Sequence, residues 1–170
     1  DMLEFFRDKA GFNIVRVRLF VNPTGSNGVC QDLDYVKSLG KRIKDAGMAF
    51  LLDFHYSDTW ADPAKQFTPK RWEGLNAKTL ADSIYRYTRH CLSALKAAGV
   101  VPATIQVGNE ITFGMDWPLG RVDPMKDDNW EVFTSLLKAG CKACREVCPT
   151  AGIIIHTEKA GVWEMTRNYY

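Results

Sequence analysis

The sequence lacks any long hydrophobic run and any strong excess of one charge. Its longest apolar stretches, such as residues 48–52, fall far short of the roughly 20 residues that a transmembrane helix requires. The 22 Lys and Arg residues nearly balance the 20 Asp and Glu residues, which leaves a formal net charge of +2. We therefore expect neither a membrane-spanning chain nor a surface that binds nucleic acid or an anionic membrane.

Cysteine is also scarce. The chain has five cysteines among 170 residues, an odd number and too few for a disulfide-stapled scaffold, so at least one thiol must stay free. Cys141, Cys144 and Cys148 share one face of a predicted helix. This spacing is compatible with a metal or cluster site. We favour core packing, because free cysteine packs as a small hydrophobe and metal ligands usually lie on loops.

A phosphate-binding loop and a secretion signal are absent as well. No Gly-rich fingerprint follows any predicted strand, which argues against a nucleotide-binding sheet. The first residues form neither a basic segment nor an apolar one, so a secretion signal is either absent or was removed before residue 1.

Segments typical of strands alternate with amphipathic helices along the chain. The predicted strands cover residues 13–20, 48–55, 103–108 and 152–157, and the predicted helices cover 32–46, 78–98 and 130–147. Residues 2–10 look like the end of a further helix. Long polar loops begin after the first three strands, at 22, 56 and 110, whereas the turns from helix to strand are short.

This alternation predicts right-handed βαβ units on a parallel sheet, either a doubly wound sheet or a (β/α)8 barrel. Long loops at the carboxyl ends of the strands favour the barrel, in which these loops carry the active site. A barrel takes about 250 residues and eight strands, so the chain accounts for about half of one. We predict a partial (β/α)8 TIM barrel, with residues 1–170 as part of a single catalytic domain truncated at both ends.

Polar and ionisable side chains stand near the ends of the predicted strands. Because the carboxyl ends of barrel strands open into one mouth, we expect these side chains to converge there. They are Arg16 and Arg18 on the first strand, His55 on the second, Asn109 and Glu110 after the third, and His156 on the fourth. Scattered surface charge is the simpler explanation for any one of them, but a poor one for the whole set.

Three segments at these strand ends resemble the endo-β-1,4-galactanases, glycoside hydrolase family 53. They are GFNIVRVRLFVNP at 11–23, DFHYSDTWADP at 53–63 and QVGNEI at 106–111. Asn-Glu at the end of a barrel strand is shared by a larger clan of retaining glycosidases, whereas the second string is the most specific to the family. The resemblance runs from about residue 3 to about residue 163.

The resemblance implies retaining hydrolysis of β-1,4-galactan in pectic side chains by two glutamates. Glu110 matches the general acid/base, and Asn109 is similar to the asparagine that hydrogen-bonds the sugar 2-hydroxyl. The segments match the second to fifth barrel strands, and the nucleophile of the family lies on the seventh. No residue here matches the nucleophile, and Glu158 aligns with a variable position that we do not assign to it. Residues 1–170 thus resemble a central fragment of the enzyme.

The same resemblance implies a set of substrate-binding residues in the mouth. Flat sugar faces stack on aromatic rings, so Trp60 is the strongest candidate and Trp163 the next, with Trp72 and Trp117 also in or near the loops. Arg18 is expected to point toward the nucleophile, with Arg16 as the weaker candidate. The complete predicted set is Arg18, His55, Asp58, Trp60, His156 and Trp163.

The resemblance implies no cofactor and no metal in this chain, although some relatives hold calcium in loops late in the barrel, outside residues 1–170. The expected partner is β-1,4-galactan, with no nucleic acid, membrane or obligate protein partner, and the expected location is secreted, either extracellular or periplasmic. Two alternatives stay open. One is a galactan-binding half-barrel without catalysis, and the other is a retaining glycosidase of the same clan that acts on β-mannan, β-glucan or xylan.

Overall fold

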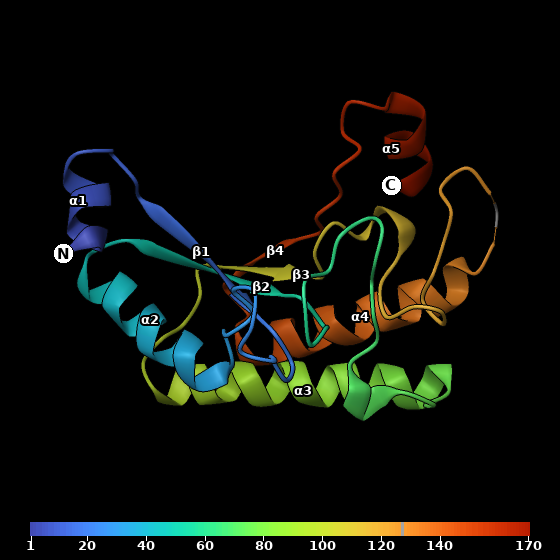
Figure 1. The fold of residues 1–170 in the computed structure, drawn as a ribbon, viewed down its shortest axis with the longest axis horizontal. Helices are drawn as coiled ribbons and strands as arrows, with labels where there is room; N and C mark the ends of the chain where they lie inside the picture. The colour runs from blue at the N-terminus through green and yellow to red at the C-terminus, as the bar shows by residue number, and fades with distance from the viewer. Residues whose placement is uncertain (127) are drawn as a thin grey trace.

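The computed structural model describes residues 1–126 and 128–170, and the predicted loop at 110–128 contains the one residue outside this description. Strands and helices alternate along most of the chain (Figure 1). The strands are β1 (Ile14–Leu19), β2 (Ala49–Phe54), β3 (Thr104–Val107) and β4 (Gly152–Ile154). The helices are α1 (Met2–Asp8), α2 (Leu33–Asp45), α3 (Ala77–Ala97), α4 (Trp130–Val147) and α5 (Trp163–Tyr169), with short 3-10 turns η1 (Lys70–Trp72) and η2 (Ile111–Phe113).

Local sequence signals begin and end the long helices. Asp32 and Asn76 cap α2 and α3, because each side chain accepts a hydrogen bond from a backbone N–H three residues ahead. Gly47 and Gly99 follow the same two helices with φ of 76° and 73°, a backbone conformation in which a residue with a Cβ is strained. The helix ends expected from these residues are confirmed.

The sheet is parallel, and its strand order is the order of the sequence, β1-β2-β3-β4. Helices α2, α3 and α4 all lie on the same side of it, below the sheet in Figure 1. A doubly wound sheet reverses its strand order at one point and carries helices on both faces. Consecutive order with one helical layer is instead the arrangement of successive units of a (β/α)8 barrel.

The two faces of the sheet differ in chemistry because side chains alternate along each strand. One face carries buried apolar residues that pack against the helices, as shown by Gly140 of α4, whose Cβ position would lie 2.8 Å from Val107. On the other face, Arg18 is paired in register with Asp53, and Asp53 is paired with Gln106. A polar row therefore crosses the sheet on the side away from the helices.

The structure differs from the sequence prediction mainly after β4. That strand ends at Ile154, three residues before the predicted end, and α5 is absent from the prediction. A helix of seven residues is too short to show a periodic apolar face. It is held in place by Tyr169, whose ring packs against Trp130 and Phe133 of α4 at centroid distances of 5.7 and 6.0 Å. No helix in the described part of the chain combines the length and apolarity needed to cross a membrane.

The polypeptide of residues 1–170, produced alone, is expected to self-associate. Within the described residues β1 and β4 each pair with a single strand, so one edge of each is open to another chain. Ile14 at the start of β1 is also 41% exposed. Light scattering after size exclusion should give a mass well above the 19.2 kDa of one chain. A monomer at micromolar concentration would contradict this expectation.

Candidate active site

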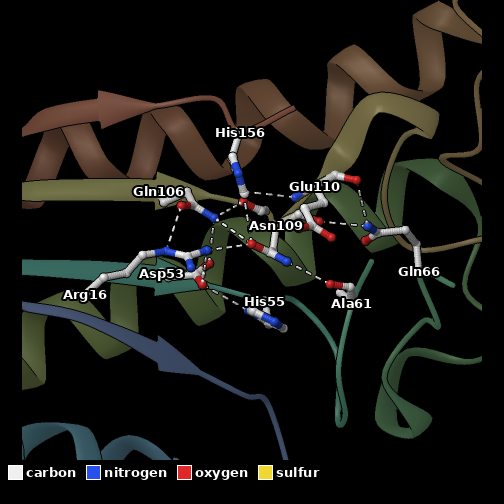
Figure 2. Close-up of polar contacts among 10 residues, drawn as sticks. Arg16, Asp53, His55, Ala61, Gln66, Gln106, Asn109, Glu110 and His156 are labelled. Atoms are coloured by element: carbon white, nitrogen blue, oxygen red, sulfur yellow. Dashed lines mark hydrogen bonds and ion pairs between the residues drawn. The ribbon is translucent and has the colours of Figure 1, made fainter. Parts of the chain in front are cut away.

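Polar side chains from all four strands meet at the carboxyl end of the sheet (Figure 2). They lie on the face that is turned away from the helices. The contributors are Arg16 on β1, Asp53 and His55 at the end of β2, Gln106, Asn109 and Glu110 at the end of β3, and His156 after β4. Of the strand-end residues expected to converge, all but Arg18 do so, and Arg18 contacts Trp60 instead.

Asp53 is the buried anion of the cluster, with a side chain that is 0% exposed. Arg16 Nη2 lies 2.8 Å from its Oδ2, and Gln106 Nε2 donates a hydrogen bond of 2.9 Å to its Oδ1. A carboxylate removed from water needs such partners, because a buried unpaired charge is strongly destabilising. The ion pair and the amide thus join β1, β2 and β3 at one point.

Asn109 is held on both sides of its amide. Its Oδ1 accepts hydrogen bonds from Arg16 Nη2 at 2.6 Å and Gln106 Nε2 at 3.2 Å, and its Nδ2 donates to the carbonyl of Ala61 at 2.8 Å. These partners determine which way the amide faces. Because Nδ2 carries two hydrogens, one N–H remains for a ligand in the mouth.

His156 connects β4 to the same pair of residues. Its Nδ1 lies 3.0 Å from Asn109 Oδ1 and 3.3 Å from the backbone N–H of Glu110. One nitrogen cannot serve both contacts, because it must donate to the oxygen and accept from the N–H. The tautomer of His156 therefore decides whether the ring supports the Asn109 side chain or the Glu110 backbone.

Glu110 has an uncommon backbone conformation, with φ of 50° and ψ of 48° in the left-handed region. Residues other than glycine seldom adopt it, and such outliers gather at active sites. The Glu110 carboxyl is partly exposed and makes no hydrogen bond or ion pair with any other residue in the described chain. The Glu110 carboxyl therefore remains open to a ligand.

The two arginines of β1 make different contacts. The sequence predicts that Arg18 points toward the nucleophile, with Arg16 as the weaker candidate. In the structure Arg16 contacts Asn109, whereas the Arg18 guanidinium lies 4.8 Å from the ring centroid of Trp60. Arg18 therefore covers one face of this tryptophan, a cation–π contact. The orientation of Arg18 toward the nucleophile stays a prediction.

Trp60, His55 and Asp58 all lie in or beside the loop after β2. Trp60 is partly exposed, and its Nε1 donates to the backbone carbonyl of Asn27 at 3.1 Å. His55 is only 1% exposed, with Nδ1 3.2 Å from Asp53, so its present contacts are with the protein. Asp58 accepts a hydrogen bond of 2.9 Å from the N–H of Lys70 and thus orders the loop. Direct sugar contact by these three residues stays a prediction.

The remaining tryptophans have three different environments. Trp72 is 5% exposed and packs edge-on against Tyr87, so the expectation that it offers a sugar platform was wrong. Trp117 is partly exposed, with the guanidinium of Arg121 4.5 Å from its ring centroid. Trp163 begins α5 and is 73% exposed, which leaves its ring open for the predicted stacking.

Glu158 is occupied by neighbours other than Asn109 and Glu110. Thr112 Oγ1 donates a hydrogen bond of 2.6 Å to its Oε2, and the ammonium group of Lys159 lies 3.7 Å from Oε1. These contacts give no support to Glu158 as the second carboxylate of the reaction, in line with the sequence interpretation.

Sequence reasoning missed Asp53, Gln106 and Gln66 as members of the site. Asp53 is an ionisable residue at the end of an apolar strand, and strand alternation places it on the same face as the arginines. Its position in the sequence could therefore have identified it as a member of the site. Gln106 lies inside a matched string but was not singled out. For Gln66 no local signal exists, because it reaches the site only through the folding of a long loop.

The cysteine-bearing helix packs into the core. Cys144 and Cys148 are 1% and 3% exposed, and burial raises the pKa of the Cys144 thiol to about 12. Core packing is confirmed for these two residues. The described residues contain no group of three or more His, Cys, Asp or Glu side chains placed to hold a metal ion.

With this geometry established, comparison with known proteins identifies the family. A model of Glycosyl hydrolase family 53 matches residues 1–170. The chain belongs to this family. An arabinogalactan endo-beta-1,4-galactanase of Humicola insolens is 36% identical over 170 residues, which cover 99% of the chain and 48% of the relative. An uncharacterized protein of Niallia circulans, from the bgaB 5′ region, is 42% identical over 161 residues, 93% of the chain and 43% of the relative.

The solved structures agree with the family 53 assignment. The Ignisphaera aggregans GH53 catalytic domain superposes with a TM-score of 0.84 at 34% identity, over 92% of this chain and 43% of that one. Together with the singly wound sheet, this confirms the partial barrel. The chain spans about half the length of the relatives it matches.

Replacing Cys144 by serine is expected to lower stability and nothing else. The substitution places a hydroxyl in an apolar site, which costs about 1–3 kcal/mol of unfolding free energy. Urea unfolding would measure the loss, and elemental analysis of both proteins would measure bound metal. A metal present in the wild type and lost in Cys144→Ser would contradict core packing as the whole role of this helix.

The buried carboxyl of Asp116 is expected to make the unfolding free energy of the protein depend on pH. This residue is 2% exposed, neither carboxyl oxygen has a hydrogen-bond partner in the described chain, and burial raises its pKa well above the usual range. Protonation therefore favours the folded state, so stability is full below the unfolded pKa of about 3.9 and falls as the pH rises through the range above it.

Asp116→Asn should remove this penalty, because the amide stays neutral. Relative to the wild type, the variant should gain unfolding free energy between pH 4 and pH 7, because only the wild type must ionise a buried carboxyl. Urea unfolding of both proteins at pH 4 and pH 7 measures the gain. The comparison cancels the contributions of the other ionisable groups, which the two proteins share. If the difference in unfolding free energy between Asp116→Asn and the wild type is the same at pH 4 and pH 7, the pH dependence does not come from Asp116.

Proposed function

We propose that the protein hydrolyses β-1,4-galactosidic bonds within galactan and arabinogalactan, the side chains of pectin, with retention of configuration. The observation that carries this proposal is the open carboxyl of Glu110 beside an Asn109 amide whose orientation is set by Arg16, Gln106 and Ala61. Membership of family 53 and the similarity to a galactanase of Humicola insolens support the choice of substrate.

Glu110 is assigned as the general acid and base. In the first step its carboxylic acid protonates the glycosidic oxygen as a carboxylate attacks the anomeric carbon. In the second step it removes a proton from the water that hydrolyses the glycosyl-enzyme. The two carboxyl groups of such enzymes stand about 5–5.5 Å apart. We place the nucleophile outside residues 1–170.

Asn109 is assigned to the sugar 2-hydroxyl. Its remaining Nδ2 hydrogen is free to donate, while Arg16 of β1, Gln106 of β3 and the Ala61 carbonyl in the loop after β2 hold the rest of the amide. A bond of this kind strengthens in the oxocarbenium-like transition state. Because the amide is already oriented, little of the interaction is lost to ordering when substrate binds.

Substrate contacts are assigned to the surrounding loops. Trp60 and Trp163 are proposed to stack on sugar rings, and Arg18, Asp58 and His156 to bind hydroxyl groups at the mouth. His55, beside Asp53, is proposed to bind substrate as well. We propose that no cofactor takes part and that the protein acts outside the cytoplasm, where its polymeric substrate is found.

Glu110→Gln in the complete natural gene product tests the proposal. The amide cannot transfer a proton, so turnover of β-1,4-galactan should fall about 10²–10⁴-fold with the fold retained. Reducing-end release measures the rate, and NMR of the first products shows whether the β-anomer is retained. Glu131→Gln, the same change at an exposed position on α4, is the matched control and should keep wild-type rates.

Other outcomes point to the other candidate functions. A substrate panel that includes β-mannan, β-glucan and xylan would reveal a clan member of different specificity. Galactan binding without any product from the wild type would indicate a non-catalytic binding protein. Full activity of Glu110→Gln would remove this residue from the mechanism.

A further inference from the structure

Gln66 lies buried where the loops after β2 and β3 meet, and it is 2% exposed. Its side-chain Nε2 lies within hydrogen-bond distance of three backbone carbonyls, those of Asn109 at 2.8 Å, Glu110 at 3.3 Å and Asp62 at 3.3 Å. Figure 2 shows the amide directed at this pair from the side opposite His156. Gln66 therefore contacts the peptide backbone of the two proposed reaction residues without facing the mouth.

The opposite loop holds Gln66 in place. The backbone N–H of Trp117 donates a hydrogen bond of 2.7 Å to the Gln66 carbonyl, and Thr68 Oγ1 donates one of 2.8 Å to the Trp117 carbonyl. Phe67, between them, forms a parallel bridge with Trp117. Residues 66–68 and Trp117 thus make a strap across the two loops, and this strap orients the Gln66 side chain before any substrate binds.

The left-handed backbone of Glu110 needs such support. For a residue with a Cβ this conformation is unfavourable, and it persists only where the surroundings determine it. Asn109 is 8% exposed, so its carbonyl has little access to water and would lose most of its hydrogen bonding without the Gln66 amide. The bonds from Gln66 favour the one local conformation in which both carbonyls meet the same donor.

We propose that Gln66 is a positioning residue that holds the Glu110 backbone in its left-handed conformation and thereby aims the carboxyl at the glycosidic oxygen. This inference rests on the proposed role of Glu110 as general acid. Gln66 itself touches no substrate. Its loss should impair proton donation while leaving the sugar-binding residues in place.

The test compares two leaving groups in the complete gene product. Galactan needs a proton on its departing oxygen, whereas the dinitrophenolate of a dinitrophenyl β-galactobioside leaves without one. Gln66→Leu keeps the side-chain volume and removes the donor. We expect kcat/KM on galactan to fall about 100-fold, the loss that a small misplacement of a reacting group produces. On the aryl substrate, kcat/KM should change less than about threefold, and Glu110→Gln should show the same selectivity.

Thr134→Val on α4 is the matched control. It removes a side-chain hydrogen bond to the carbonyl of Glu131, outside the strap, and leaves the Gln66 amide in place, so its ratio of the two kcat/KM values should stay close to that of the wild type. Should Gln66→Leu fail to fold by circular dichroism, Gln66→Asn keeps the amide on a shorter stem and should show a smaller loss of the same selectivity.

The outcomes separate the two proposals. Equal losses on both substrates, or no loss on either, would overturn the positioning role of Gln66. A selective loss in Glu110→Gln but none in Gln66→Leu would overturn only the role of Gln66. If Glu110→Gln keeps full activity on galactan, the proposed function itself fails, and the role of Gln66 fails with it.

Discussion

The site depends on the interactions of the buried Asp53 carboxylate. It is fully removed from water, and Arg16, Gln106 and His55 each approach it from a different side. Removing one of these partners would be destabilising, because the buried charge of Asp53 would be left without full compensation. The same guanidinium and the same amide also reach Asn109, so the charge that is buried at β2 determines the orientation of a side chain after β3.

The helical layer makes this polar cluster possible. Close packing of α2, α3 and α4 on one face of the sheet supplies the apolar burial that stabilises the fold. The opposite face is thereby free to carry charged side chains, which alternate with the buried ones along each strand. Loops after β2 and β3 then meet through Gln66, Thr68 and Trp117, and they enclose Asn109 while the carboxyl of Glu110 stays open.

Helix and strand patterns were sufficient for much of the fold. The predicted helix at 130–147 matches α4 in both bounds, and the other long helices agree within one residue at each end. Strands were shorter than predicted, because apolar residues continue beyond the last ladder pair, as at Ile155. Trp72 was expected in a sugar-binding loop, but it is buried. A position in a loop does not show whether an aromatic ring faces the mouth or the core.

By itself, the sequence determined the order of strands and helices, the turn residues and the strings that carry Asn109 and Glu110. These features depend on residues only a few positions apart, because hydrophobic periodicity and turn preferences are local properties of the sequence. Only the tertiary structure decided that Arg16 rather than Arg18 contacts Asn109, that His55 is buried, and that Gln66 supports Glu110. Arg16 lies 93 residues before Asn109, and Gln66 lies 43 and 44 residues before Asn109 and Glu110. Such contacts are chosen by strand register and loop packing, which no local pattern encodes.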